Sequence, residues 1–103
     1  MYDTRGEPDW SYLGEHVANR SKRHVGDTDI PLAWVLEAFY DMNATLIDPD
    51  YNSKTGESFR VIGYSHSAGF VVTIILVRDS GELYGASAWK ANTKDIRLYG
   101  GTV

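Results

Sequence analysis

The sequence predicts a small α+β protein: an antiparallel sheet of three or four strands, with two helices before it and one short helix after it. Two observations predict this class. Apolar residues recur at helical spacing in the N-terminal part, and three runs rich in β-branched and aromatic residues follow, separated by polar turns. Helices grouped beside a small meander are typical of α+β domains. A chain of 103 residues has the length of one domain, so we expect residues 1–103 to form a single unit.

The first expected helix covers residues 9–24. Asp9 is its candidate N-cap, and Gly26 follows its expected end. Trp10, Leu13 and Val17 recur at helical spacing and form a narrow apolar stripe. We therefore expect this helix to lie on the surface, with its stripe against the core.

The second expected helix covers residues 30–42. Asp29 is its candidate cap, and Pro31 is tolerated in the first turn. Its apolar residues recur every three or four positions, so we expect them to be buried together. They are Leu32, Val35, Leu36, Phe39 and Met42.

The three apolar runs predict strands at residues 59–65, 70–78 and 83–89. Short turns at 67–69 and 79–82 predict hairpins, and hence antiparallel pairing. The run 70–77 is almost continuously apolar, which is typical of a central strand buried on both faces. A short helix is expected at 93–99, because Asn92 can cap it and Asp95 follows three residues later, as in a capping box.

Composition excludes several classes of protein. Apolar residues are 43% and charged residues 23%, so the chain is not a disordered one. The absence of cysteine excludes a disulfide-stapled module, a thiol nucleophile and a cysteine-ligated zinc site. The formal net charge of −4 requires any nucleic-acid site to rest on a local basic cluster.

The apolar segments are too short for a membrane span. The run 70–77 is far shorter than the ~20 residues that a spanning helix needs. The N-terminal residues contain no apolar stretch typical of a signal peptide. We expect a cytoplasmic protein with no membrane partner.

Residues 87–99, Ser-Ala-Trp-Lys-Ala-Asn-Thr-Lys-Asp-Ile-Arg-Leu-Tyr, resemble the C-terminal signature of BrnT-like toxins. That signature reads Ser-Ala-Arg-[Arg/Lys]-Ala, followed by a short helix with Glu-Arg and a Tyr near its end. The hairpin that contains Arg60-Val61-Ile62-Gly63 and the acidic loop Asp48-Pro49-Asp50 fit the family too, and the resemblance covers about residues 10–99. The chain departs from the signature at Trp89, at Asp95 and at Ile96, where the family has Arg, Glu and Arg.

The resemblance implies a RelE-like fold and the toxin of a type II toxin–antitoxin pair. Such toxins are ribonucleases that arrest growth, and no cofactor is expected. The expected partners are RNA and an antitoxin of the ribbon-helix-helix type, encoded beside the toxin and bound to it in a hetero-oligomer.

RNA cleavage without a metal needs groups that move protons and groups that stabilise a charged phosphorane. His16, Arg20 and Arg23 share one flank of the first expected helix. Lys90 precedes an expected helix N-terminus, where anions are favoured, and Arg97 matches the arginine of the family signature. We expect catalytic roles for His16, Lys90, Arg97 and Tyr99. We expect RNA or phosphate binding by Arg20, Arg23, Arg60, Arg78 and Trp89.

Other interpretations of the same residues stay open. Arg20 and Arg23 can be surface charges or antitoxin contacts, and Arg97 can pair with Asp95 or Glu82. Tyr99 can pack its ring on the sheet, and Trp89 can pack under the last helix or contact a partner. Asp48 and Asp50 suit turn capping better than a metal site. His66 is expected to be an exposed turn residue, and the chain contains no nucleotide-binding or hydrolase motif.

Three functions are therefore compatible with the sequence. The first is a toxin ribonuclease. The second is a catalytically inactive relative of such toxins that serves as a protein-interaction or regulatory module, favoured by the acidic charge and by Trp89. The third is a domain that binds single-stranded nucleic acid through Arg60 and Tyr64, which share one face of a strand.

Overall fold

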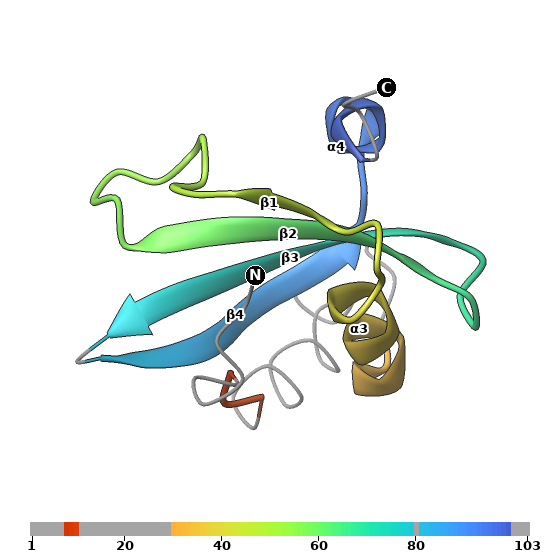
Figure 1. The fold of residues 1–103 in the computed structure, drawn as a ribbon, viewed down its shortest axis with the longest axis horizontal. Helices are drawn as coiled ribbons and strands as arrows, with labels where there is room; N and C mark the ends of the chain where they lie inside the picture. Colours follow the sequence, from red (N-terminus) through yellow and green to blue (C-terminus); the bar gives the residue numbers. More distant parts are fainter. Residues whose placement is uncertain (1–7, 11–29, 80, 100–103) are drawn as a thin grey trace, which may run out of the picture.

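Four antiparallel strands form a meander with a short helix before it and another after it (Figure 1). The computed structural model describes residues 8–10, 30–79 and 81–99. The sheet order is β1-β2-β3-β4, so each strand pairs with its neighbours in sequence. The elements are α3 (Leu32–Phe39), β1 (Thr45–Ile47), β2 (Ser58–Ser65), β3 (Phe70–Asp79), β4 (Glu82–Lys90) and α4 (Thr93–Leu98). The predicted α+β class is confirmed.

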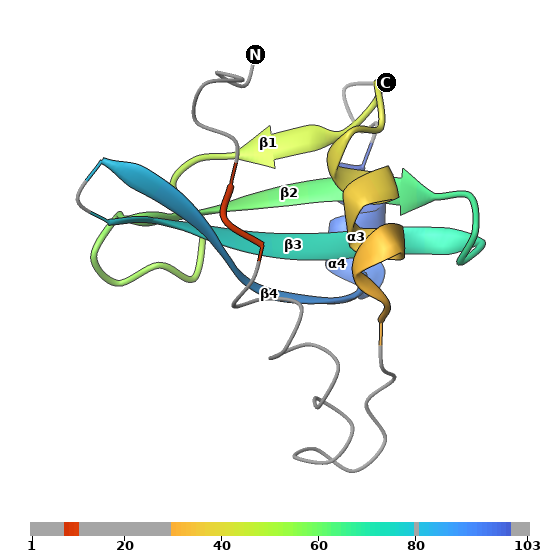
Figure 2. The same cartoon turned by 90° about the horizontal axis from the view of Figure 1, so that it is seen from below.

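The two helices lie on opposite faces of the sheet (Figures 1 and 2). On the α3 face, Val61, Ile74 and Leu76 are fully buried with Val35 and Ala38 of the helix. Close approach of α3 requires a glycine in β2, because a Cβ at position 63 would lie 1.9 Å from the Ala38 carbonyl oxygen.

The three predicted strands are confirmed to within one residue at each end, and so are both hairpin turns. Gly69 and Gly81 adopt positive φ angles of 78° and 81° in these turns. In β3, Thr73 faces α4 while Val72 and Ile74 face α3, and all three have no exposed surface. This strand is therefore buried on both faces where the helices cover it.

β1 was not located by the sequence pattern. It is three residues long and pairs with β2, and among the strands of the described residues it forms one edge of the sheet. Alternation of apolar and polar residues cannot be recognised over three positions.

The second expected helix ends earlier than its pattern predicts, at Phe39 rather than residue 42. Asp41 stops it, because its carboxylate accepts hydrogen bonds from the backbone N–H groups of Asn43 and Tyr64 and turns the chain toward β1. The placement of Met42 in the buried face is therefore wrong: its side chain is 96% exposed. The helix also begins later than predicted, at Leu32 rather than residue 30. Its N-cap position is Pro31, so the prediction that Asp29 caps it is wrong.

The first expected helix falls almost wholly outside the described residues. Asp9 belongs to an extended segment beside β4, where its N–H donates to the Leu83 carbonyl and its carbonyl accepts from the Gly85 N–H. The cap of the last helix is confirmed, since Asn92 Oδ1 accepts from the Asp95 N–H at 2.9 Å. Within the described part of the chain, no helix has the length and apolar character of a membrane span.

Candidate functional site

The basic residues expected to bind RNA do not form one cluster in the described part of the chain. Arg60 is 3% exposed, and its Nε donates to Asp50 at 2.5 Å while its Nη1 donates to Asp95 at 2.7 Å. Its guanidinium also lies 4.1 Å from the centre of the Tyr51 ring. Arg60 is thus enclosed between the loop before β2 and helix α4.

Asp95 is the centre of this buried network. It accepts hydrogen bonds from the hydroxyls of Thr73 and Tyr51, both at 2.6 Å, besides that from Arg60. Burial raises the pKa of Asp95, but these hydrogen bonds and the Arg60 charge outweigh it and hold the pKa below its usual value. The ionised Asp95 ties α4 to β2, to β3 and to the loop that carries Tyr51.

The other basic residues that were expected at the site and that the structure describes lie on different parts of the surface. They are Arg78, Lys90 and Arg97. Arg78 pairs with Asp48 at 2.5 Å near the end of β3, and both side chains are exposed. Lys90 pairs with Val72 in the sheet register, so it is on the α3 face, with its Nζ 5.2 Å from the Phe70 ring centre. Arg97 is exposed on α4, across the sheet from Lys90.

Two aromatic residues expected at the RNA site are held by other contacts. Trp89 is half-buried opposite Thr73 in the sheet register, 5.8 Å from the Arg60 guanidinium. The Tyr99 hydroxyl donates to Asp41 at 2.5 Å, and burial together with this bond raises the pKa of Tyr99 to about 12. His16, Arg20 and Arg23 lie outside the described residues.

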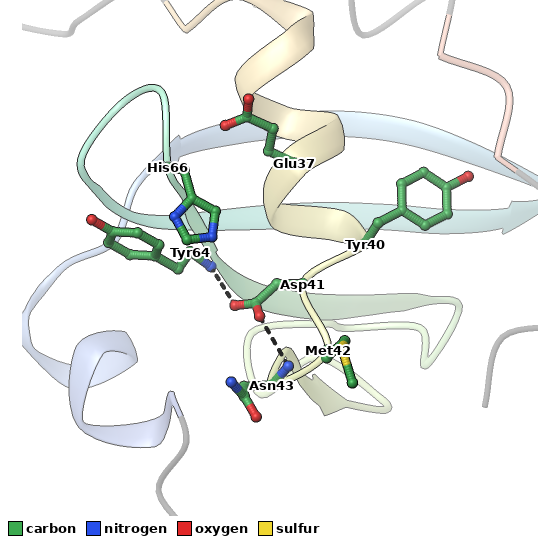
Figure 3. A pocket seen from close by; sticks show the side chains of 7 residues that line it. All are labelled: Glu37, Tyr40, Asp41, Met42, Asn43, Tyr64 and His66. Atoms are coloured by element: carbon green, nitrogen blue, oxygen red, sulfur yellow. Dashed lines mark hydrogen bonds between the residues drawn. The ribbon is translucent and has the colours of Figure 1, made fainter.

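The structure does place an open pocket of about 440 Å³ at the C-terminal end of α3 (Figure 3). No local sequence pattern indicates this pocket, because its walls come from the helix, the turn before β1 and the end of β2. Its lining residues are Glu37, Tyr40, Asp41, Met42, Asn43, Tyr64 and His66.

Two carboxylates of this pocket are held ionised. Glu37 accepts hydrogen bonds from the Ser67 hydroxyl and backbone N–H and from the Ser65 hydroxyl, which together lower the pKa of Glu37 to about 2. Burial raises the pKa of Asp41, but bonds from Tyr99, Asn43 and Tyr64 outweigh it and lower that pKa. These donors are all neutral groups, so both negative charges remain.

Aromatic and apolar side chains complete the pocket. The rings of Tyr64 and His66 pack edge to face with centres 5.1 Å apart, and His66 is exposed, as the sequence predicts. Tyr40 and Met42 are 57% and 96% exposed at the rim. His66 is the one basic residue among the described residues that line the pocket, beside the carboxylates of Glu37 and Asp41. Two carboxylates against one imidazole favour a cationic group over a phosphate.

Comparison of the chain with models of protein families, with curated proteins and with solved structures finds no match.

Proposed function

We propose that this protein is the partner-binding member of a toxin–antitoxin type pair, and that it serves as a protein-interaction module at the corner between α3 and β1. The observation that carries the proposal is the exposure of Tyr40, Met42 and Leu46 in one short segment at this corner. Tyrosine and methionine are enriched in protein interfaces, where they supply buried apolar contact area. A partner that covers this segment removes three large side chains from water.

The edge of the sheet beside this segment is a second reason to place the partner at this corner. β1 lies at the edge of the sheet and pairs on one side with β2. Leu46, at its centre, is 45% exposed. Edge strands offer backbone groups to which a partner can add, and an apolar side chain there increases the gain from burial. The resemblance to BrnT-like toxins supplies the expected partner, a ribbon-helix-helix antitoxin encoded beside this chain.

Charge supports protein binding over RNA binding at this corner. The chain carries a net charge of −4, and the pocket beside Tyr40 contains the ionised carboxylates of Glu37 and Asp41. RNA phosphates would be repelled here, whereas a basic protein segment would be attracted.

Co-expression with the small protein encoded beside this chain tests the proposal. We expect a complex that co-elutes in size-exclusion chromatography, and we expect Met42→Asp or Leu46→Asp to abolish it. Ile96→Asp is the matched control, because Ile96 is an apolar residue of α4 that is 50% exposed on the other face. Absence of a complex, or equal loss in the control, contradicts the proposal.

A second candidate function is metal-independent RNA cleavage at α4. Lys94 and Arg97 are exposed on this helix, and the Lys94 ammonium lies 3.8 Å from the centre of the exposed Tyr51 ring. Cations beside an exposed aromatic ring are typical of single-strand binding sites. Induced expression in a bacterial host with analysis of cellular RNA tests it. Growth arrest with cut RNA, relieved by Arg97→Ala at equal soluble level, would favour this candidate, and normal growth with intact RNA would reject it.

A further inference from the structure

We infer that α4 is a strap over the guanidinium of Arg60, and that it opens as a unit while α3 stays packed on the other face of the sheet (Figures 1 and 2). The inference goes beyond the proposed function and does not depend on the proposed partner.

α4 contributes little apolar surface to the fold. Of its six residues only Asp95 is buried, and Ile96 is 50% exposed. The apolar core formed by the described residues includes none from α4, whereas α3 adds Val35, Ala38 and Phe39 to it. Apolar burial is the dominant favourable term in folding, and elements with little of it open locally before the rest unfolds. α4 is therefore the element expected to open first.

Hydrogen bonds fasten α4 at both of its ends. Near the start, Asp95 accepts from the hydroxyls of Thr73 and Tyr51 and from Arg60. Near the end, the Leu98 carbonyl accepts from the Thr45 hydroxyl at 3.3 Å. Water replaces such bonds when a segment leaves the surface, so each contributes only modestly to the closed state. The Asp95 carboxylate also regains its hydration, which offsets part of the loss.

The Tyr99 hydroxyl, one residue beyond α4, donates to Asp41 at 2.5 Å. This bond joins the strap to the turn after α3. The strap thus has two fastenings that can be weakened separately, one at Asp95 and one at Tyr99.

The rest of the sheet does not need α4 in order to stay in place. Ala91, just before the strap, is 5% exposed and its N–H donates to the Val71 carbonyl at 2.9 Å. Arg60 keeps the carboxylate of Asp50, whose own N–H donates to the Ser58 carbonyl at 2.9 Å. The chain can therefore open beyond Ala91 with β2, β3 and β4 still paired.

Opening changes the state of Arg60. In the closed protein this side chain is 3% exposed and pairs with two carboxylates. In the open protein it retains Asp50 alone and reaches water. A helix of six residues is not stable by itself in water, so the released strap loses its own hydrogen bonds as well. The strap thereby controls access to a guanidinium on this face of the sheet.

Native-state hydrogen exchange of the isotope-labelled full chain, followed by NMR in increasing urea, tests the strap. The amides of Ile96 and Tyr99 report on it, because they donate to the carbonyls of Asn92 and Asp95 at 2.9 Å. After correction for intrinsic rates, we expect them to exchange at least about tenfold faster than the slowest amides of β3. Their exchange should also depend less on urea, since opening of α4 exposes little surface.

Two variants weaken the fastenings of the strap. Thr73→Val removes a hydroxyl that donates to Asp95, and Tyr99→Phe removes the one that donates to Asp41. Each should speed exchange of the α4 amides at least about threefold, because the bond exists only in the closed state. Ser67→Ala is the matched control, since it removes a donor to Glu37 instead and should leave the α4 amides unchanged.

A third variant separates opening of the strap from unfolding of the whole chain. Val35→Ala leaves a cavity between α3 and the sheet, where Val35 has no exposed surface. It weakens the closed and the open protein equally, because α3 stays packed in both. We expect the slowest amides of β3 to exchange at least about tenfold faster in this variant, and those of α4 to keep their wild-type rates. The urea dependence of the wild type keeps the test valid if Val35→Ala does not fold.

α4 amides that exchange as slowly as those of β3, with the same dependence on urea, would overturn the inference. So would α4 amides that speed up together with β3 in Val35→Ala, because α4 would then open only with the whole fold. Unchanged α4 rates in both Thr73→Val and Tyr99→Phe would show that these contacts do not fasten it. None of these results would affect the co-elution test of the proposed partner.

Discussion

Arg60 Nη1 donates to the Asp95 carboxylate at 2.7 Å, and the two side chains are 3% and 0% exposed. This pair joins β2 to α4 on the face of the sheet opposite α3 (Figure 2). Two charges removed from water are tolerated because further groups pair with them. Asp50 accepts a hydrogen bond from Arg60, and the hydroxyls of Thr73 and Tyr51 donate to Asp95.

Removal of Asp95 should therefore destabilise the protein strongly. Asp95→Ala leaves the Arg60 charge buried with one carboxylate instead of two, and we expect a loss of about 3–5 kcal/mol in the free energy of unfolding. Asp48→Ala breaks the exposed pair with Arg78 and should cost less than about 1 kcal/mol. Urea unfolding of both variants measures the difference, and equal losses would show that the buried network is not the stronger contact.

Stability should fall in acid as Glu37, Asp41 and Asp95 become protonated. Their pKa values are lowered in the folded protein, that of Glu37 from 4.5 to about 2. A lowered pKa stabilises the fold above the unfolded-state pKa, and this stabilisation is lost as the pH falls through the folded-state value. We expect the unfolding free energy to decrease from about pH 4.5 toward pH 2.

Glu37→Gln isolates one part of that decrease, because glutamine does not titrate. Its unfolding free energy should fall less steeply than that of the wild type between pH 4.5 and about 2. Ser67→Ala removes one donor to Glu37 and should move the decrease to higher pH. Profiles parallel to the wild type in both variants would exclude Glu37 as a source of the acid sensitivity.

Gly63→Ala should disrupt the contact between α3 and the sheet. The added Cβ would meet the Ala38 carbonyl oxygen at 1.9 Å, so the helix must shift, and we expect a loss of more than about 2 kcal/mol. Gly69→Ala meets no atom within 4 Å, but its φ of 78° should cost about 1–2 kcal/mol. A Gly63→Ala protein as stable as the wild type would contradict the close packing of α3 on β2.

Tyr99→Phe should weaken the connection between the end of α4 and the turn after α3. It removes the hydroxyl that donates to Asp41, a bond to a charged group worth about 1.5–3 kcal/mol. NMR of labelled tyrosine rings should show one phenol ionising at about pH 12 in the wild type and missing in the variant. A signal that titrates well below pH 12 and vanishes in Tyr99→Phe would contradict the bond.

The strands and the cap of α4 could be predicted because their signals are local. Alternating or continuous apolar residues mark β2, β3 and β4, and Asn92 with Asp95 marks the start of α4. The end of α3 could not be predicted in this way. The carboxylate that stops the helix, Asp41, acts through the N–H of Tyr64, 23 positions further along the chain.

The sites depend on pairings that no local pattern contains. An arginine such as Arg60 can bind phosphate, and the sequence around it does not show that it is already paired. Its partner Asp95 lies 35 positions away along the chain. One signal was present, since an arginine between apolar residues of a central strand must be paired if it is buried. The pocket unites Glu37 with His66 only because the β2–β3 turn folds against α3.

Hydrogen exchange of the free chain, and of the chain mixed with the antitoxin that we propose as its partner, tests the central claim most directly. We predict new protection of backbone amides over residues 40–47, where Tyr40, Met42 and Leu46 are exposed in the free chain. The amides of α4 should exchange equally in both states. Protection confined to residues 93–99, with none over 40–47, would contradict the account and place the partner on the α4 face.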